Sequence, residues 1–167
     1  TDGDGYGDNT NGNLGDDCPN TAGASSRDRR GCLDIDFDGF SDANDRYPGD
    51  PTQWADSDND SYGDNPLGVN GDSCPTVFGN STMGILGCPD QDGDGYADQT
   101  DDLPFEPTQW DDLDGDGYGD SVQGVNYDEF KFDPTQQTDS DGDGYGDNIG
   151  GTRGDACPDD YGNSTVD

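Results

Sequence analysis

Aspartates at alternating positions, followed by a glycine, are the residues of this sequence best suited to chemistry. The pattern D-x-D-x-D-G-x-x-D occurs six times, and residues 34–42 form a complete example. Three carboxylates within a five-residue turn repel one another strongly in the absence of a cation. Glycine at the sixth position permits the positive φ that folds the turn back on itself. Hard oxygen ligands in a flexible ring favour calcium over zinc or copper, so the sequence predicts one or two calcium ions at each loop.

We call each copy an aspartate loop and name it by its first residue in the sequence. The first copy starts at Asp2, because its first aspartate would lie one place before Thr1. The Asp56 loop has Ser61 where the others have glycine, so its site is expected to be weaker or strained.

The predicted ligands occupy fixed positions in the repeat. The carboxylates within the loops are Asp2, Asp4 and Asp8; Asp34, Asp36, Asp38 and Asp42; Asp56, Asp58, Asp60 and Asp64; Asp90, Asp92, Asp94 and Asp98; Asp112, Asp114, Asp116 and Asp120; and Asp139, Asp141, Asp143 and Asp147. The aromatic seventh residues, which would supply a backbone carbonyl, are Tyr6, Phe40, Tyr62, Tyr96, Tyr118 and Tyr145. One aspartate further along the chain completes each set: Asp16, Asp45, Asp72, Asp101, Asp128 and Asp155.

Other metal-binding modules fit the pattern less well. An EF-hand needs a glutamate at the twelfth position and a helix on each side, and no copy has that glutamate. The flanks are rich in proline and show no apolar period of 3.6 residues, which also argues against a dockerin. The nonapeptide β-roll requires uninterrupted G-G-x-G-x-D, which is absent. Zinc would need histidines or C-x-x-C pairs, and the chain has neither.

The loops belong to a larger repeat. Complete loops begin at residues 34, 56, 90, 112 and 139, so a period of 56 residues combines a long and a short half. The predicted units are residues 1–54, 55–110, a shortened unit 111–137, and the start of a fourth unit at 138–167. The motif Asp50-Pro51-Thr52-Gln53-Trp54 recurs in phase at 106–110 and, weakened, at 133–137. We expect the natural polypeptide to continue in both directions, with each unit contacting mainly its neighbours.

The repeat resembles the thrombospondin type 3 repeat. The Asp34 and Asp90 loops read D-x-D-x-D-G-x-x-D-x-x-D, and Asp-x-Cys-Pro follows the loops of the long halves at 16–19, 72–75 and 155–158. The resemblance implies little regular secondary structure, in an elongated extracellular array that wraps around a string of calcium ions. The 56-residue period, the Pro-Thr-Gln-Trp motif and the cysteine spacing depart from that family. The array looks more like the versions in large microbial surface proteins.

Cysteines and sequons also follow the repeat. Cys18 and Cys32 are 14 residues apart, as are Cys74 and Cys88, so we predict a disulfide in each pair. By the same spacing we expect Cys157 to pair with a residue at position 171, beyond the given sequence. Disulfides indicate an oxidising, extracellular setting. Asn80 and Asn163 begin N-S-T sequons at equivalent positions and are predicted to carry glycans.

The overall composition excludes several classes of protein. The 167 residues include 40 acidic and six basic side chains and no histidine, for a formal charge of −34, and only 25% are hydrophobic. Such a chain cannot build a conventional hydrophobic core, and it would be repelled by nucleic acid. No apolar run is long enough to span a membrane. No set of residues suggests catalysis, so we expect no enzyme activity.

The leading functional hypothesis is a structural, calcium-binding segment of a secreted or cell-surface stalk or fibre. Its partners would be calcium, neighbouring repeats of the same longer chain, covalent glycans and other copies in a filament. The alternative is a calcium-dependent adhesion module that binds glycans or partner proteins. The seventh-position aromatics and the tryptophans are expected to pack between units, with a sugar-binding platform as the other use. A calcium buffer would need neither disulfides nor a fixed phase.

Overall fold

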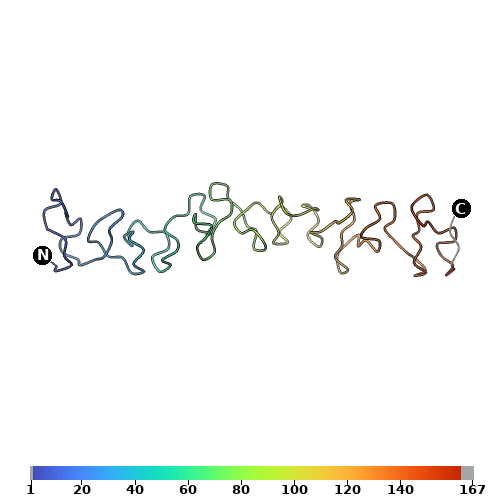
Figure 1. The fold of residues 1–167 in the computed structure, drawn as a ribbon, viewed down its shortest axis with the longest axis horizontal. Coiled ribbons are helices and arrows are strands. Elements are labelled where there is room, and N and C mark those ends of the chain that lie inside the picture. Colours follow the sequence, from blue (N-terminus) through green and yellow to red (C-terminus); the bar gives the residue numbers. More distant parts are fainter. Residues whose placement is uncertain (1, 163–167) are drawn as a thin grey trace. The chain divides into compact units, whose positions relative to one another are not determined.

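The chain is built from turns and bends. The computed structural model describes residues 2–162, and Asn163, one of the two predicted glycan sites, lies outside them. Within the described residues there is no helix and no extended strand (Figure 1). The only strand-like pairings there are four isolated parallel bridges: Gly7–Gly15, Gly63–Gly71, Gly119–Tyr127 and Gly146–Gly154. The expectation of little regular secondary structure is confirmed for this part of the chain.

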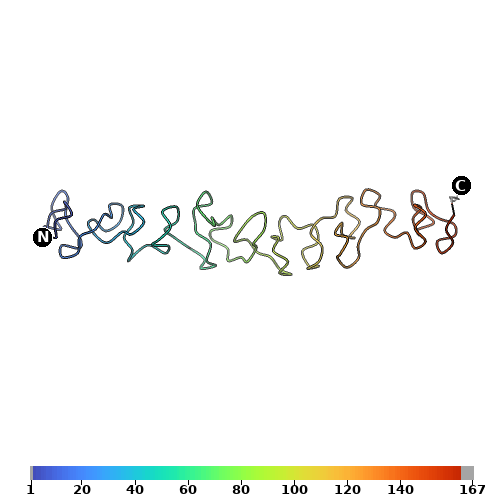
Figure 2. The same cartoon turned by 90° about the horizontal axis from the view of Figure 1, so that it is seen from below.

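The chain divides into two compact units, Thr1–Pro89 and Asp90–Asp167. The division lies inside the second predicted repeat unit, at the start of the Asp90 loop. Within each unit the chain passes through one loop after another, as both views show (Figures 1 and 2).

The buried residues are mainly polar. The buried apolar side chains of the described chain are Cys32, Cys88 and Ala97. The largest fully buried side chains are three glutamines, Gln53, Gln109 and Gln136. Carboxylates and amides therefore form the interior, and their hydrogen bonds must replace the apolar packing of an ordinary domain.

The three buried glutamines clamp segments that lie further along the chain. Gln53 Nε2 donates to the carbonyl oxygens of Asn65 at 2.8 Å and Val69 at 3.1 Å, while its Oε1 accepts from the Asn65 backbone N–H at 3.0 Å. Gln109 and Gln136 make the same three bonds to residues 12 and 16 positions ahead. Each of these glutamines ends a segment that reads Asp or Glu, then Pro-Thr-Gln. We call such a segment a glutamine clamp, and we call the later segment to which its glutamine bonds the socket.

The residues before each glutamine also belong to the clamp. Thr52 Oγ1 donates to Asp50 at 2.6 Å and accepts the backbone N–H of Val69 at 2.8 Å. Thr108 and Thr135 make the equivalent bonds with their own acidic neighbours and sockets. The recurrence of this motif in the sequence did not by itself indicate this role.

Aromatic side chains pack along the chain as stacked pairs. Phe40 stacks on Trp54 with ring centroids 5.4 Å apart and an interplanar angle of 10°. Tyr96 stacks on Trp110 with the corresponding values of 5.2 Å and 11°. The guanidinium of Arg27 lies over both rings of the first pair, at 5.6 Å from the Phe40 centroid. Seventh-position aromatics thus pack with tryptophan as expected, but each pair lies within one predicted repeat unit, 1–54 or 55–110, rather than between units.

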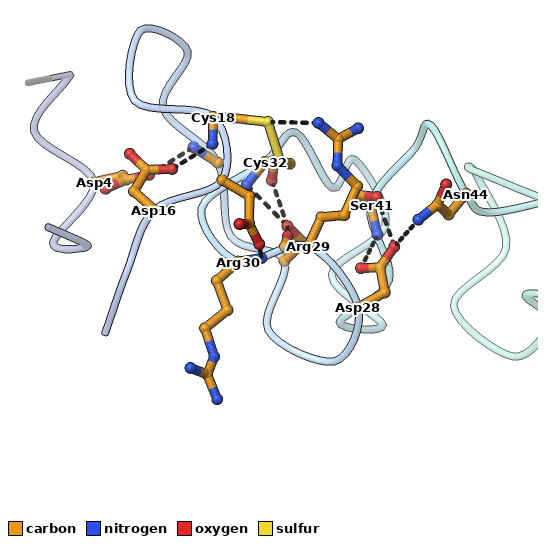
Figure 3. The surroundings of a disulfide bond; sticks show 12 residues. Asp4, Asp16, Cys18, Asp28, Arg29, Arg30, Cys32, Ser41 and Asn44 are labelled. Atoms are coloured by element: carbon orange, nitrogen blue, oxygen red, sulfur yellow. Dashed lines mark hydrogen bonds between the residues drawn. A yellow bond between two sulfur atoms is a disulfide. The ribbon is translucent and has the colours of Figure 1, made fainter. Parts of the chain in front are cut away.

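Both predicted disulfides are present. Cys18 pairs with Cys32, and Cys74 pairs with Cys88, with Cα–Cα distances of 5.0 and 5.2 Å. Cys157 is a free, exposed thiol. Figure 3 shows the first bridge beside the predicted metal ligands Asp4 and Asp16. The second disulfide ring, residues 74–88, also lies against a predicted ligand, because the N–H of Gly79 donates to Asp60.

Candidate metal centres

Carboxylate oxygens converge at the aspartate loops. In each group, one oxygen from every member lies within 4.8 Å of the others, which is close enough for one ion to contact all of them. Five of the groups are Asp2, Asp4 and Asp16; Asp34, Asp36 and Asp38; Asp56, Asp58 and Asp60; Asp90, Asp92 and Asp94; and Asp112, Asp114 and Asp116. The structure thus brings the predicted alternating aspartates together.

Hydrogen bonds to the backbone give each loop its shape. In the Asp34 loop, the two oxygens of Asp34 accept the N–H groups of Phe37 at 2.7 Å and Gly39 at 3.1 Å. Asp36 and Asp38 each use one oxygen to accept the N–H two residues ahead. Because one oxygen of each of these two side chains is held by the backbone, the second oxygen is directed into the group.

The sixth position adopts the positive φ that the sequence predicts. The φ angle is 102° at Gly39 and 99° at Gly5. Ser61 takes the same turn with a φ of 84°, and Asn59 two residues earlier has a φ of 66°. A residue with a Cβ is strained in this region, by roughly 1–2 kcal/mol. The Asp56 loop therefore keeps the common shape at a cost in stability.

Many of the converging oxygens are buried and have no hydrogen-bond partner. They are Oδ2 of Asp2, Asp36, Asp38, Asp58, Asp92, Asp94 and Asp141, both carboxylate oxygens of Asp114, and Oδ1 of Asp120. A buried carboxylate oxygen without a partner is costly. A cation in contact with these oxygens would supply the missing partner. Since the converging atoms are all carboxylate oxygens, the residues fit a hard cation.

A buried aspartate beyond each loop offers a further candidate ligand. Asp16 and Asp72 are 0% exposed, and each uses Oδ1 to accept the N–H of the cysteine two residues ahead, at 2.7 and 2.6 Å. The Oδ2 atoms of Asp16, Asp72 and Asp155 are buried without a partner. Equivalent N–H bonds are made by Asp45, Asp101, Asp128 and Asp155. We call these six residues the distal aspartates.

The raised pKa values of distal aspartates connect them to their own loops. The pKa of Asp128 is raised to about 6, mainly by burial and also by the negative charges of Asp116 and Asp114. Burial likewise raises the pKa of Asp72, with a contribution from Asp60 of its loop. The same direction and cause apply to Asp45 and Asp101. Each of these carboxylates faces the third and fifth positions of the loop before it, where a cation would remove the repulsion.

The ninth-position aspartates have a second role that sequence reasoning missed. Asp42 Oδ1 accepts the N–H of Ile35 at 2.9 Å, which closes the loop on itself. The equivalent residues of the Asp56, Asp90, Asp112 and Asp139 loops do the same. Side-chain hydrogen bonding from Ser140 lowers the pKa of Asp147. No described hydrogen bond uses the seventh-position carbonyls, so they stay available to an ion.

The disulfide rings supply two backbone donors to the site beside them. In the first unit these are the N–H of Cys18, bonded to Asp16, and the N–H of Gly23, which donates to Asp4 Oδ2 at 3.2 Å (Figure 3). In the second ring, the N–H of Gly79 donates to Asp60 Oδ2 at 3.1 Å. Sequence reasoning missed these glycines, and their recurrence in phase 56 residues apart was the signal that could have found them.

No protein-family model matches the chain, and a search of curated proteins finds no match.

Proposed function

We propose that this chain is a structural, calcium-binding segment of a secreted or cell-surface stalk or fibre. The observation that carries the proposal is the repeated set of buried carboxylate oxygens without hydrogen-bond partners, at the loops and at the distal aspartates. Each set gathers oxygen ligands from one loop and the segment that follows it. An ion bound there would fix the path of the chain between the two.

Calcium is the cation that these residues suit best. It accepts six to eight oxygen ligands in flexible arrangements, whereas magnesium needs a near-ideal octahedron. The chain has no histidine, and four of its five cysteines are in disulfides, so softer metals lack ligands. The resemblance of the loops to thrombospondin type 3 repeats supports the same choice. We propose one or two ions at each loop.

A structural role follows from the charge. A chain with a formal charge of −34 and few apolar residues expands unless its carboxylates are neutralised. Calcium binding would therefore supply most of the free energy of folding. Since the carboxylates would serve as ion ligands and Trp54 and Trp110 stack within the chain, we propose a scaffold rather than an enzyme or a sugar-binding platform.

The proposed location is outside the cell. Two disulfides are consistent with a secreted protein. Asn80 is exposed and begins a sequon, which makes it the proposed glycan site within the described residues. Glycans and disulfides would add stiffness to the calcium-bound chain.

Removal of calcium tests the proposal. Circular dichroism and small-angle X-ray scattering would be recorded on the chain in calcium, after chelation, and after calcium is restored. We expect reversible expansion on chelation, and calorimetric affinities on the order of 10⁻⁴–10⁻³ M per site. Magnesium at the same concentration should not restore the folded state. A scattering profile unchanged by the chelator would refute the proposal.

A further inference from the structure

The Asp34 loop exposes three apolar side chains. Leu33, Ile35 and Phe37 alternate with the loop's first three aspartates, and all three are exposed, Phe37 by 77%. We call these three residues the apolar patch. No other complete loop has large apolar residues at all three places; the Asp56 loop, for example, has Ala55, Ser57 and Asn59. Since the other loops also gather their aspartates, the patch is not needed for a loop to form.

Phe37 belongs to the patch at the cost of a strained backbone. The fourth loop position has a positive φ in all six loops, and five of the residues there are glycine or asparagine: Gly3, Asn59, Gly93, Gly115 and Gly142. Phe37 is the sixth, with a φ of 65°. A bulky side chain is disfavoured in this region, and the Phe37 ring is in neither of the aromatic pairs of the described chain. Strain without compensating packing points to a binding role.

A groove in the second compact unit has a complementary character. Residues 129–133, with Thr152 and Arg153, line a groove of about 360 Å³, which is within the size range of ligand sites. Phe130 and Phe132 give it apolar walls, and Phe132 is 82% exposed. Lys131 and Arg153 are two of the six basic residues of the chain. We call this the cationic groove.

The preceding repeat has an equivalent groove without the cations, which we call the acidic groove. It is formed by residues 102–106 and also measures about 360 Å³. Phe105 stands where the cationic groove has Phe132, and Pro104 stands where it has Lys131. The charged residues of the acidic groove are Asp102 and Glu106. Cations are therefore not needed to form such a groove, and their presence at residues 131 and 153 changes what it attracts.

The cations of the cationic groove remain available to a second molecule. Its two acids, Glu129 and Asp133, already accept backbone N–H groups of the same chain. Lys131 Nζ donates to the Asp120 carbonyl oxygen at 2.7 Å, which uses one of its three N–H groups. The guanidinium of Arg153 lies over a tyrosine ring, 5.0 Å from the centroid, and makes no ion pair among the described residues. Both cations therefore keep donors for a partner.

We propose that the apolar patch of one copy of this chain binds in the cationic groove of a second copy. A chain with a formal charge of −34 is repelled by most of the surface of another copy. In the cationic groove Lys131 and Arg153 reduce that repulsion. The phenylalanine walls of the groove would cover the exposed side chains of the patch, and aromatic anchors of this kind carry much of the affinity of protein interfaces.

The contact joins two different surfaces, so each copy can offer its patch to one neighbour and its groove to another. Head-to-tail contacts of this type build open filaments or closed rings. The inference rests on the proposed function and deepens it, because calcium bound at the Asp34 loop would hold the patch in place. It identifies the partner within a fibre as another copy of the chain.

Sedimentation velocity of the full chain tests the proposal. Samples from about 10 μM to about 1 mM would be compared in calcium and in chelator, which would reveal even a weak association. We expect the sedimentation coefficient to rise with concentration in calcium only. A chain that calcium folds, as judged by circular dichroism, but that stays monomeric at every concentration would overturn this inference and leave the proposed function standing. A circular dichroism spectrum unaffected by calcium would refute the proposed function, and this inference with it.

Two variants separate binding from folding. Phe37→Gly removes the exposed ring and relieves the positive φ, so we expect a higher Tm together with at least tenfold weaker association. Phe132→Ser removes a wall of the groove at an exposed position, so we expect at least tenfold weaker association with an unchanged Tm. Phe105→Ser, at the equivalent and 75% exposed position of the acidic groove, is the matched control and should associate like the original chain.

Mixing the two variants tests whether the patch meets the groove. The Phe37→Gly chain keeps an intact groove, and the Phe132→Ser chain keeps an intact patch. We expect each to be monomeric alone and equal amounts of the two to form a heterodimer without larger species. A mixture that stays monomeric, or a Phe132→Ser chain that still associates with itself through its patch, would overturn the proposal. Equal weakening by Phe105→Ser and Phe132→Ser would also overturn it.

Discussion

The backbone N–H of Gly23 donates to Oδ2 of Asp4 at 3.2 Å, although the two residues are 19 positions apart. Gly23 belongs to the first disulfide ring and Asp4 to the first aspartate loop. The disulfide therefore holds a backbone donor against a candidate metal ligand, and the same arrangement recurs between Gly79 and Asp60.

Loss of the first disulfide should weaken metal binding at the Asp2 loop. Closing a ring of about 15 residues restricts the unfolded chain by roughly 3 kcal/mol. We expect the double variant Cys18→Ser/Cys32→Ser to bind calcium at that loop about tenfold more weakly or worse. NMR shifts of the Gly5 amide during a calcium titration would report it. The Gly117 amide is the internal control, because residues 111–137 contain no cysteine, and equal weakening at both loops would contradict a local effect.

Replacing a clamp glutamine by glutamate should destabilise the second compact unit. Gln109→Glu preserves the shape of the side chain but removes the donors to Ser121 O and Val125 O and buries a charge beside those carbonyls. We expect a loss of about 2–4 kcal/mol and a lower Tm in calcium. Gln123→Glu, at an exposed position, is the matched control and should change the Tm little. A Gln109→Glu chain as stable as the control would show that the clamp contributes nothing.

Relief of strain at Ser61 should strengthen the Asp56 loop. Ser61 has a φ of 84°, where glycine carries no Cβ penalty. We expect Ser61→Gly to stabilise the calcium-bound chain by about 1 kcal/mol and to tighten calcium binding at this loop, as calorimetry would measure. Ser73→Gly, whose backbone φ is not positive, should give no such gain.

In the absence of calcium, acid should favour the compact chain. Burial raises the pKa of Asp128 to about 6, above the ordinary value of 3.8 expected in an unfolded chain. Its contribution to stability is therefore complete below about pH 3.8 and is lost as the pH rises through about 6. We expect the radius of gyration in chelator to be smaller at pH 4.5 than at pH 7.5, and Asp128→Asn to reduce this difference. A radius independent of pH would argue against buried aspartates as the source of expansion.

Periodicity made part of this structure predictable from sequence. The alternating aspartates and the cysteine pairs recur at fixed offsets, so Asp34, Asp36 and Asp38, or Cys18 and Cys32, could be assigned to one site without any coordinates. The direction of single oxygen atoms could not, because whether a carboxylate oxygen accepts a backbone N–H depends on local φ and ψ angles. Asp42 shows this: its position in the motif suggested only a metal ligand, yet it also closes the loop through Ile35.

The glutamines were harder to predict for a different reason. A buried, fully bonded glutamine and an exposed one have the same composition and hydropathy. A recurring motif indicates that a residue has a role but does not show which atoms it contacts. What distinguishes Gln53 from Gln99 or Gln123 is a set of acceptors 12 and 16 residues ahead, which no local pattern contains. These acceptors could have been predicted only from the constant spacing between each clamp glutamine and the glycines of its socket.

The partners of the clamp amides are backbone atoms, and this bears on how such a chain could change its length over evolutionary time. Asn65 is replaced by Ser121 in the next socket, and Val69 by Val125 and Thr152, with the glutamine bonds unchanged. After a segment is duplicated or deleted, the new neighbours could therefore form the same clamp bonds. The other side chains of the socket would not matter, provided that the glycines and the spacing were kept. Recombination at these junctions could lengthen or shorten the molecule in whole modules, without a second mutation to repair the join.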